Sequence, residues 1–396
     1  MVDFVEYITY EEVYKAYKDC AKHKRKTANA ANFEIDEYEN IYHLYEVLNT
    51  KKYVIGCSIT FLCEFPKWRE IFAADFIDRI VQHIIVNRLN PFLEKEFIPN
   101  SFSCRKNKGT LRGLKTLQKE AYELSYNFKK KIYILKCDCR SYFYSLDKRI
   151  LFQKVIALID KYNIFDNKIK DFYIDIIKQI IFNTPQYHCK RKGTADEWER
   201  HIDHKKSLFY CDKFHGLPIG NVSSQVFSNV YMNDFDHWVT EKLGFKYYGR
   251  YCDDFYILSD SKEKLLDAVI KIREYLQGIN ITLHPNKIYI QEFSKGVTFI
   301  GGIVKENRTY ISNRTLGRCY NLLIKTYNYA QHNELTKEDL QYFVTSLNSY
   351  FGFFKHHKTY NIRKKIAKSE YLKPFLGEYI HFNKDYEKVI LNDKYK

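Results

Sequence analysis

The order of strand-like and helix-like segments in the middle of the chain predicts an α+β fold built on a ferredoxin-like sheet. Strands are expected where β-branched and aromatic residues cluster in short runs, and helices where apolar residues recur at helical spacing. The expected strands are 132–138, 245–251, 255–258 and 287–291, and the expected helices are 147–160, 223–243 and 263–276. In this split arrangement the helices cover one face of the sheet and the two central strands are neighbours.

The chain is long enough to bury a sizeable core in two or three subdomains, because 45% of its 396 residues are hydrophobic. Within residues 66–95, Phe76, Ile80, His83 or Ile84, and Asn87 recur at helical spacing and predict a packed helix. Residues 100–113 are polar and basic and contain glycine, so we expect a loop there, followed by a helix at 114–124.

The formal net charge of +16 favours a polyanionic partner such as a nucleic acid. Residues 306–396 hold 16 Lys and Arg against 9 Asp and Glu, a net charge of +7, and are expected to form a helical subdomain that grips nucleic acid. A membrane partner is disfavoured, because no run approaches the roughly 20 apolar residues that span a bilayer. The start, Met1 to Tyr7, lacks a secretory signature, and ten singly spaced cysteines fit reduced thiols in a bacterial or phage-encoded cytoplasmic protein.

Two adjacent acids, Asp253 and Asp254, lie between two β-prone runs and indicate a tight hairpin turn that presents carboxylates. The strand at 132–138 ends on a third acid, Asp138, which the sheet order brings to the same edge. Carboxylates packed together repel one another unless cations neutralise them, so the pattern predicts bound Mg²⁺. Two ions about 3.5–4 Å apart would activate a 3′-hydroxyl and stabilise departing pyrophosphate, with Mn²⁺ as a substitute. A solvated acidic turn is the alternative, and Asp147 is expected to be a charge at a helix N-terminus rather than a ligand.

A second set of metal-binding residue types occurs at His188, Cys189, His201 and His204. The eleven-residue gap after Cys189 matches no standard zinc spacing, and the basic run 190–192 repels a cation. We therefore interpret this stretch as a basic surface loop.

Three segments in this order resemble the motifs of reverse transcriptases, in particular the bacterial enzymes of group II introns, retrons and diversity-generating retroelements. They are the catalytic box Tyr251-Cys-Asp-Asp254, the first aspartate motif at 136–147, and the nucleotide-pocket motif Gly216-Leu-Pro-Ile-Gly-Asn-Val-Ser-Ser-Gln225. The resemblance implies a right-hand polymerase with fingers, a ferredoxin-like palm sheet and a helical thumb. The implied division is an N-terminal region with fingers (1–131), palm (132–160), a fingers or palm insertion (161–215), palm (216–305) and a basic helical thumb (306–396).

The resemblance also implies roles for single residues. Asp138 and Asp253 would be the metal ligands and Asp254 would support them as a third catalytic residue. Phe143 matches the aromatic gate that excludes a ribose 2′-hydroxyl, with ordinary core packing as the alternative. The remaining residues implied to bind the nucleotide are Arg69, Ile219, Gly220, Gln225 and Lys287, of which Arg69 and Lys287 would meet the triphosphate.

Template and primer contacts are implied in two further places. Arg105, Lys106 and Lys108 resemble the template-contacting loop of the fingers, with solvated basic residues as the alternative. The run 297–302, with Phe299 and Gly301, resembles the primer-grip hairpin, where glycine permits a close backbone approach.

One departure from the motif is informative. Many relatives have a Gln where this chain has Ile219, and a Pro where it has Gln225. This variant, together with the run 346–364, resembles the enzymes of diversity-generating retroelements. Loss of the Gln amide weakens the positioning of nucleotide and template, so reduced fidelity is a hypothesis.

The sequence therefore predicts an RNA-directed DNA polymerase that copies an RNA template into cDNA from dNTPs, in a diversity-generating retroelement. That context implies a structured RNA and a small basic accessory protein. An antiviral defence enzyme that copies a noncoding RNA, with self-assembly into a homo- or hetero-oligomer, is the alternative. A catalytically idle RNA-binding protein and an RNA-templated RNA polymerase are less favoured, because the three acids and Phe143 are all present.

Overall fold

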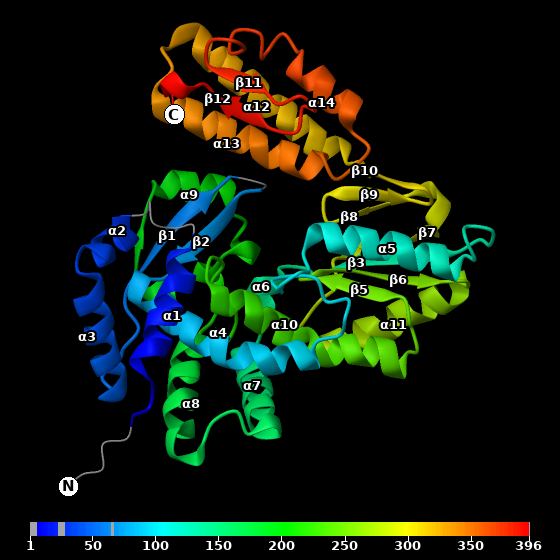
Figure 1. Cartoon of the computed structure of the whole chain (residues 1–396). Helices are drawn as coiled ribbons and strands as arrows, with labels where there is room; N and C mark the ends of the chain where they lie inside the picture. The colour runs from blue at the N-terminus through cyan, green and yellow to red at the C-terminus, as the bar shows by residue number, and fades with distance from the viewer. Residues whose placement is uncertain (1–5, 23–27, 65–66, 396) are drawn as a thin grey trace. The chain divides into compact units, whose positions relative to one another are not determined.

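The computed structural model describes residues 6–22, 28–64 and 67–395 of a mixed α/β chain (Figure 1). The first five residues, on which the expectation about a secretory signal rests, lie outside this range, as does Pro66 of the expected helical run. The chain packs into two compact units, each made of segments that are distant in the sequence. Unit 1 is formed by the described residues within Met1–Cys104, Cys137–Phe255 and Asp267–Ile288, and unit 2 by those within Arg105–Lys136, Tyr256–Leu266 and Tyr289–Lys396.

Four of the helices described in unit 1 pack against α4, namely α1, α2, α8 and α10. The helix α4 begins after Asp75, whose side chain accepts a hydrogen bond from the Ile77 amide, and it buries Phe76, Ile80 and Ile84 as the spacing predicted. The helices are α1 (Tyr10–Ala21), α2 (Ala28–Ile35), α3 (Glu37–Asn49), α4 (Phe76–Glu96), α6 (Tyr142–Ser145), α7 (Lys148–Tyr162), α8 (Asn167–Phe182), α9 (Ala195–His201) and α10 (Val222–His237).

A three-stranded sheet in unit 1 has the order β2-β1-β4. The strands β1 (Ser58–Cys63) and β2 (Arg69–Ala73) form an antiparallel pair, and β4 (Cys189–Arg191) pairs with β1 in parallel. The basic segment that the sequence indicated as a surface loop therefore supplies a short edge strand, because its backbone pairs with β1 whatever its side chains are.

A four-stranded sheet has the order β5-β6-β3-β7, formed by β3 (Tyr133–Asp138), β5 (Tyr248–Tyr251), β6 (Asp254–Ser259) and β7 (Tyr289–Glu292). This is the strand order of a ferredoxin-like sheet, and it confirms the predicted hairpin and the predicted adjacency of β3 and β6. The helix α11 (Lys262–Gly278) connects β6 to β7. The register of β3 and β7 runs from Tyr133 opposite Glu292 to Lys136 opposite Tyr289.

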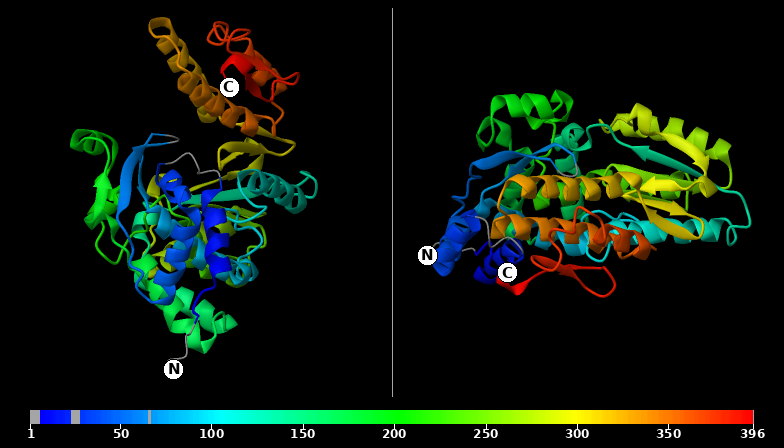
Figure 2. Two further views of the ribbon diagram at one scale, coloured as in Figure 1. Left: turned by 60° about the vertical axis from the view of Figure 1, so that its left-hand side comes forward. Right: turned by 90° about the horizontal axis from the view of Figure 1, so that it is seen from above.

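Unit 2 has its own hydrophobic core between α12, α13 and the C-terminal strands, with Leu323, Phe343, Leu347 and Phe351 all buried. Figure 2 shows α12 and α13 side by side, in yellow-orange and orange. The elements are α5 (Thr110–Leu124), β8 (Val297–Phe299), β9 (Gly302–Lys305), β10 (Arg308–Ile311), α12 (Asn313–His332), α13 (Lys337–Phe354), α14 (Tyr360–Ala367), β11 (Ile380–Phe382) and β12 (Val389–Leu391). The region after residue 306 is therefore helical as expected, but it also holds the strand β10 and the antiparallel pair β11-β12.

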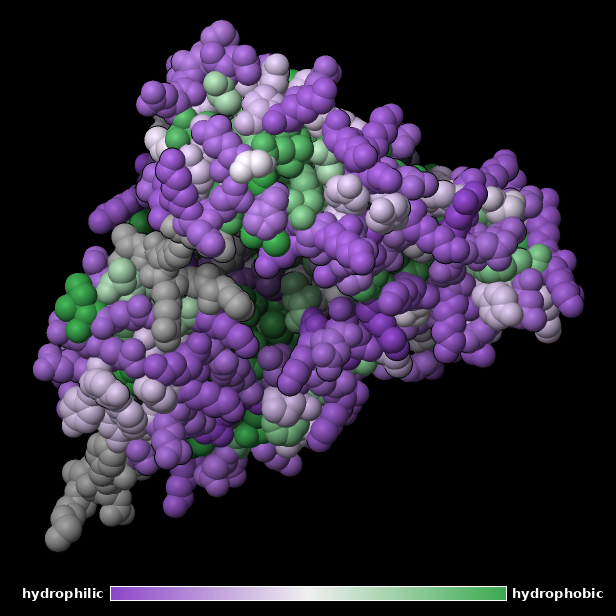
Figure 3. All heavy atoms as spheres, turned by 45° about the horizontal axis from the view of Figure 1, so that its top comes forward, coloured by the Kyte–Doolittle hydropathy of each residue, from purple (hydrophilic) through white to green (hydrophobic). Residues whose placement is uncertain are grey.

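Short helical turns complete the described part of the chain. The 3₁₀ turns are Pro185–Tyr187, His204–Lys206, Leu208–Tyr210, Pro285–Lys287, Phe293–Lys295 and Asp393–Tyr395, and a π-helical turn covers Trp238–Lys242. The face shown in Figure 3 is mostly hydrophilic, with scattered apolar residues. None of the helices that the structure describes is both long and apolar enough to cross a membrane.

Candidate active site

Two carboxylates, Asp138 and Asp253, come together in unit 1 at the ends of neighbouring strands. Asp138 is the last residue of β3, and Asp253 immediately precedes β6. The backbone joins them, because the Cys139 amide donates to the Asp253 carbonyl at 3.1 Å. Burial raises the pKa of Asp253, and the negative charge of Asp138 raises it further. The two acids therefore repel one another and favour a cation between them.

Two cationic side chains accompany the acids. The Lys287 ammonium lies 2.7 Å from Oδ1 of Asp138, and the turn that carries it is tied to β3 because the His284 amide donates to the Asp138 carbonyl at 2.8 Å. Arg69, the exposed first residue of β2, acts on Asp253 from another element. The positive charges of Arg69 and Lys287 both lower the pKa of Asp253 against the effects of burial and Asp138. Four residues predicted for the site thus lie within electrostatic reach of one another.

The third acid does not complete a three-carboxylate group. Among the described residues, no group of three or more His, Cys, Asp or Glu side chains is arranged to hold a metal ion. Asp254 begins β6, directly after Asp253, which lies in the turn. Its role as a third, supporting acid stays a prediction. A donor set of two carboxylates still fits Mg²⁺, which is usually held by one or two carboxylates with water and substrate phosphates.

A buried ion pair that sequence reasoning missed supports the turn with the acids. Arg250 on β5 and Asp236 on α10 are both fully buried, with Nε and Nη2 of Arg250 at 2.7 and 2.6 Å from the two carboxylate oxygens. Burial alone would lower the pKa of Arg250, but the charge and hydrogen bonds of Asp236 outweigh it and raise that pKa. Nη1 of Arg250 donates to the Cys252 carbonyl at 3.0 Å, so this pair fixes the residue that precedes Asp253.

A second anchor holds the same turn from the segment that precedes residue 105. Cys252 has a positive φ of 54°, and its amide donates to Oγ of Ser103 at 3.2 Å. Ser103 and Asn229 of α10 bond reciprocally, with Oγ to Oδ1 and Nδ2 to the Ser103 carbonyl both at 2.8 Å. The left-handed conformation at Cys252 is therefore held by two hydrogen bonds, one that its amide donates to Ser103 Oγ and one that its carbonyl accepts from Arg250 Nη1.

The predicted nucleotide-pocket motif packs directly on β2. The Phe72 amide donates to the Ile219 carbonyl at 2.8 Å, and the Ala74 amide donates to Oδ1 of Asn221 at 3.2 Å. Gly220 has φ of 122°, and a Cβ there would lie 2.8 Å from Cγ2 of Ile71 and 3.1 Å from the Phe72 carbonyl oxygen, so only glycine fits. The side chain of Ile219 is half-buried and Gln225, in the first turn of α10, is exposed.

The candidate gate Phe143 lies on α6, five residues after Asp138. It is half-buried, and its ring meets the Tyr142 ring edge-on at 5.4 Å. Its carbonyl accepts a hydrogen bond from the Leu217 amide at 2.8 Å, which joins the gate segment to the pocket motif. Partial exposure agrees better with a residue that meets a ligand than with an ordinary core residue.

The predicted template and primer residues belong to unit 2. Arg105, Lys106 and Lys108 lie in a turn before α5, in which the Lys108 amide donates to the Arg105 carbonyl at 3.3 Å. Phe299 is fully buried and packs edge-on against Tyr256 at 5.1 Å, so it belongs to the core. Gly301 is exposed with φ of 90°, and a close backbone approach is feasible there.

The alternative zinc set does not form a site in the described part of the chain. The ring of His201 stacks on Trp68 and the ring of His204 stacks on Tyr210, both with centroids 4.0 Å apart. These histidines therefore pack against aromatic rings. Asp147 accepts a hydrogen bond from the Arg149 amide at the start of α7, which confirms its expected place at a helix N-terminus.

A comparison with solved structures finds telomerases of two Candida species. The apo telomerase of Candida tropicalis truncated from its C-terminal domain is 14% identical with a TM-score of 0.45, and the match covers 65% of this chain and 55% of that one. Telomerase of Candida albicans in complex with a TWJ fragment of telomeric RNA is 12% identical with a TM-score of 0.46, covering 82% of this chain and 60% of that one. A further apo telomerase structure from Candida tropicalis is 13% identical, with a TM-score of 0.46 and coverage of 81% and 57%. The chain thus spans less than two thirds of the length of these proteins.

No curated protein matches the chain. A family model described as reverse transcriptase (RNA-dependent DNA polymerase) matches residues 64–304. The matched region is more than half of the chain and contains Arg69, Asp138, Phe143, Asp253 and Lys287. The chain therefore belongs to the reverse transcriptase (RNA-dependent DNA polymerase) family.

Proposed function

We propose that this protein is an RNA-directed DNA polymerase that makes cDNA on an RNA template by nucleotidyl transfer. The observation that carries the proposal is the pair Asp138 and Asp253, which share one end of two adjacent strands with Lys287 and Arg69 around them. Two acids with two cations in one place suit a reaction in which a polyanionic triphosphate is bound and pyrophosphate departs. Template RNA and dNTPs are the substrates that the family implies.

The residues of the chain divide the work by their chemistry. The Arg69 guanidinium, exposed at the start of β2, is suited to hold the triphosphate with paired N–H donors. The Lys287 ammonium neutralises Asp138 in this structure and is placed to donate a proton to pyrophosphate or to pair with its charge. Phe143 would close the sugar side of the pocket, and Ile219 and Gly220, which pack against β2, would form its backbone wall. Gln225, exposed at the start of α10, adds a side-chain amide.

Enzymes of this family use a divalent metal ion. Asp138 and Asp253 would hold Mg²⁺, as two ions with Mn²⁺ as a substitute, and Asp254 would support the site. When bound, such ions lower the pKa of the primer 3′-hydroxyl and neutralise charge on the leaving pyrophosphate. Arg105, Lys106 and Lys108 would contact the template, and the turn with Phe299 and Gly301 would contact the primer through its backbone.

Primer extension on an RNA template with dNTPs and Mg²⁺ tests the proposal. Asp253→Asn should abolish incorporation while RNA binding persists, because a neutral amide is a poor Mg²⁺ ligand. Asp260→Asn is the matched control, since Asp260 follows the other end of β6, its side chain is 69% exposed, and its partner is Lys264 at 3.7 Å. The control should extend the primer like the wild type. Synthesis by Asp253→Asn at the control rate would contradict the proposed site.

For the biological setting we propose a diversity-generating retroelement, with a structured RNA and a small basic accessory protein as partners. The support is the Ile219 variant of the pocket motif and the C-terminal run 346–364. Sequencing the copurified nucleic acid and the DNA made on it tests the setting. A template that matches a repeat in a neighbouring gene supports it. A short repetitive product would instead indicate antiviral defence, and bound RNA without any DNA product would indicate an idle RNA-binding protein.

A further inference from the structure

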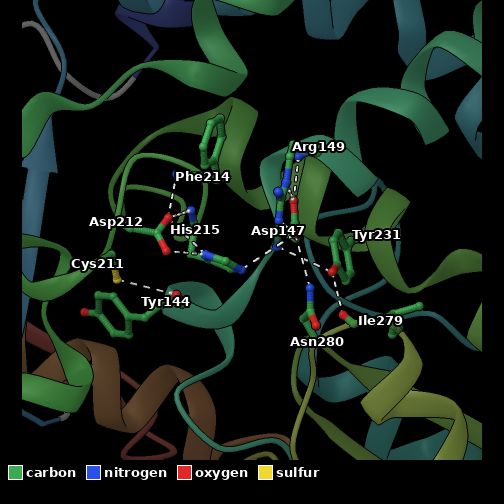
Figure 4. Close-up of polar contacts among 10 residues, drawn as sticks. All are labelled: Tyr144, Asp147, Arg149, Cys211, Asp212, Phe214, His215, Tyr231, Ile279 and Asn280. Atoms are coloured by element: carbon green, nitrogen blue, oxygen red, sulfur yellow. Dashed lines mark hydrogen bonds and ion pairs between the residues drawn. The ribbon is translucent and has the colours of Figure 1, made fainter.

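A hydrogen-bond network centred on the buried carboxylate of Asp147 lies in unit 1 (Figure 4). Asp147 is only 2% exposed, and its carboxylate is saturated with donors. Oδ1 accepts from the Arg149 amide at 2.8 Å and from Arg149 Nε at 3.1 Å. Oδ2 accepts from Arg149 Nη2 at 2.6 Å and from Asn280 Nδ2 at 3.2 Å, and His215 Nε2 lies 3.6 Å away.

The network joins four segments that are distant in the sequence. His215 is itself held by Asp212, whose Oδ2 is 2.8 Å from Nδ1, and Arg149 lies over the Phe214 ring with its Cζ 5.0 Å from the centroid. The Asp147 amide donates to the Tyr231 hydroxyl of α10 at 3.4 Å, and that hydroxyl donates to the Ile279 carbonyl at 2.6 Å. Burial raises the pKa of Asp147, but the hydrogen bonds and charge of Arg149 outweigh it and hold that pKa below its usual value.

This network stands at one end of a short antiparallel ladder whose other end is the nucleotide pocket. Asp147 pairs with His215, the Lys148 amide donates to the Phe214 carbonyl at 2.8 Å, and the Gly216 amide donates to the Leu146 carbonyl at 2.9 Å. The ladder ends with the Leu217 amide on the Phe143 carbonyl. The position of the Phe143 backbone relative to the pocket motif therefore depends on how firmly the Asp147 end is fixed.

On this basis we propose that Asp147 is a positioning residue for Phe143, and that it sets the discrimination between deoxyribonucleotides and ribonucleotides. The inference rests on the proposed polymerase function. The gate excludes a 2′-hydroxyl by shape, and a displacement of about 1 Å at such a contact changes rates by up to about 100-fold. A ladder fixed only by main-chain hydrogen bonds would let the Phe143 backbone shift by a fraction of that distance.

Asp147→Asn is the sharpest perturbation, because it separates helix capping from the ionic network. Asn caps a helix as well as Asp, so Oδ1 still accepts from the Arg149 amide and α7 keeps its N-terminus. The new amide nitrogen, at the place of Oδ2, faces two donor nitrogen atoms, Arg149 Nη2 and Asn280 Nδ2. Donors then oppose donors at both contacts and the network opens.

The matched control is Asp166→Asn. Asp166 caps α8 in the same way, with its side chain accepting from the Lys168 amide at 2.9 Å, but it is exposed and takes no part in the ladder. Arg149→Gln is a second perturbation that does not depend on the folding of Asp147→Asn. The Arg149 side chain is 55% exposed, so its replacement leaves the core intact while it removes both guanidinium bonds to Asp147.

The experiment measures kcat/KM for dCTP and for CTP on an RNA template, and takes their ratio so that the fraction of folded enzyme cancels. Asp147→Asn should lower the ratio about tenfold and Arg149→Gln in the same direction, while Asp166→Asn stays within about twofold of the wild type. Phe143→Ala should lower the ratio further, and the double variant Phe143→Ala/Asp147→Asn should match Phe143→Ala alone, because Asp147 acts through Phe143.

An unchanged ratio in both Asp147→Asn and Arg149→Gln would overturn the inference, as would a double variant in which the two effects multiply. If the wild type prefers dCTP in that experiment, either outcome overturns the inference alone and the proposed polymerase function stands. A wild type that incorporates no nucleotide contradicts the proposed function and the inference with it. A wild type that accepts CTP and dCTP equally refutes the gate, and thereby the role of Asp147.

Discussion

Replacement of Asp236 by Asn should destabilise the protein strongly, because it leaves Arg250 charged and buried without its counter-ion. The carboxylate of Asp236 accepts three hydrogen bonds, from Arg250 Nε at 2.7 Å, from Arg250 Nη2 at 2.6 Å and from the Tyr248 hydroxyl at 2.6 Å. Asn offers one acceptor oxygen, and its amide nitrogen faces a donor instead. Hydrogen bonds to charged groups contribute roughly 1.5–3 kcal/mol each, and a broken buried ion pair costs about 3–5 kcal/mol. We therefore expect a loss of about 4 kcal/mol.

Guanidinium denaturation followed by circular dichroism measures this loss, and Asp234→Asn is its control on the same helix. Asp234 pairs with Lys154 at the surface with its side chain 63% exposed, so its replacement should cost less than about 1 kcal/mol. The double variant Asp236→Asn/Arg250→Met should recover most of the stability, since neither charge remains and the Asn oxygen still accepts from Tyr248. It should not recover polymerase activity, because the bond from Arg250 to the Cys252 carbonyl is gone. A loss of stability in Asp236→Asn no larger than in the control would refute this reasoning.

Two further predictions concern groups around the nucleotide pocket. Glu70 is buried on β2, burial raises its pKa to about 7, and hydrogen bonds from the Leu208 amide and the Ser207 hydroxyl offset this only in part. An acid whose folded-state pKa is raised binds its proton more tightly when folded, so its stabilising contribution is present below about pH 4.5 and is lost as the pH rises to about 7. The unfolding free energy of Glu70→Gln, taken relative to that of the wild type, should therefore rise by about 3 kcal/mol when the pH is raised from 5 to 8. The same difference between variant and wild type at both pH values would contradict the raised pKa of Glu70. Ile219→Gln should lower the error frequency on RNA templates several-fold by restoring a hydrogen-bonding amide to the pocket, and sequencing of the cDNA that shows unchanged errors opposite all four template bases would refute the fidelity hypothesis.

The elements that carry the site followed from local patterns in the sequence. The strand ending at Asp138 and the hairpin around Asp253 are runs of β-branched and aromatic residues, and the apolar residues of α4 recur at helical spacing. In these segments the local sequence preference and the pattern of buried residues indicate the same element. The adjacency of β3 and β6 then followed from the ferredoxin-like order. The capping role of Asp147 was predictable because it depends on the two residues that follow it.

Other features depend on contacts between distant residues and left no local signal. The pair Arg250 and Asp236 resembles two ordinary charged residues in the sequence, and only the packing of α10 on β5 buries both. The short strand β4 forms from polar residues by backbone pairing with β1, and Phe299 is core because Tyr256 covers it.

The most direct test of the proposed chemistry is the single-turnover rate of dNMP incorporation by Asp138→Asn as a function of Mg²⁺ concentration. Asp138 contributes a carboxylate from β3 that pairs with the Lys287 ammonium at 2.7 Å near the surface, so the substitution removes a ligand without disturbing the core. We expect a rate at least about 1,000-fold below that of the wild type, not restored at saturating Mg²⁺. A rate within about tenfold of the wild type at saturating Mg²⁺ would contradict the assignment of Asp138 and Asp253 as the metal-binding pair of a polymerase.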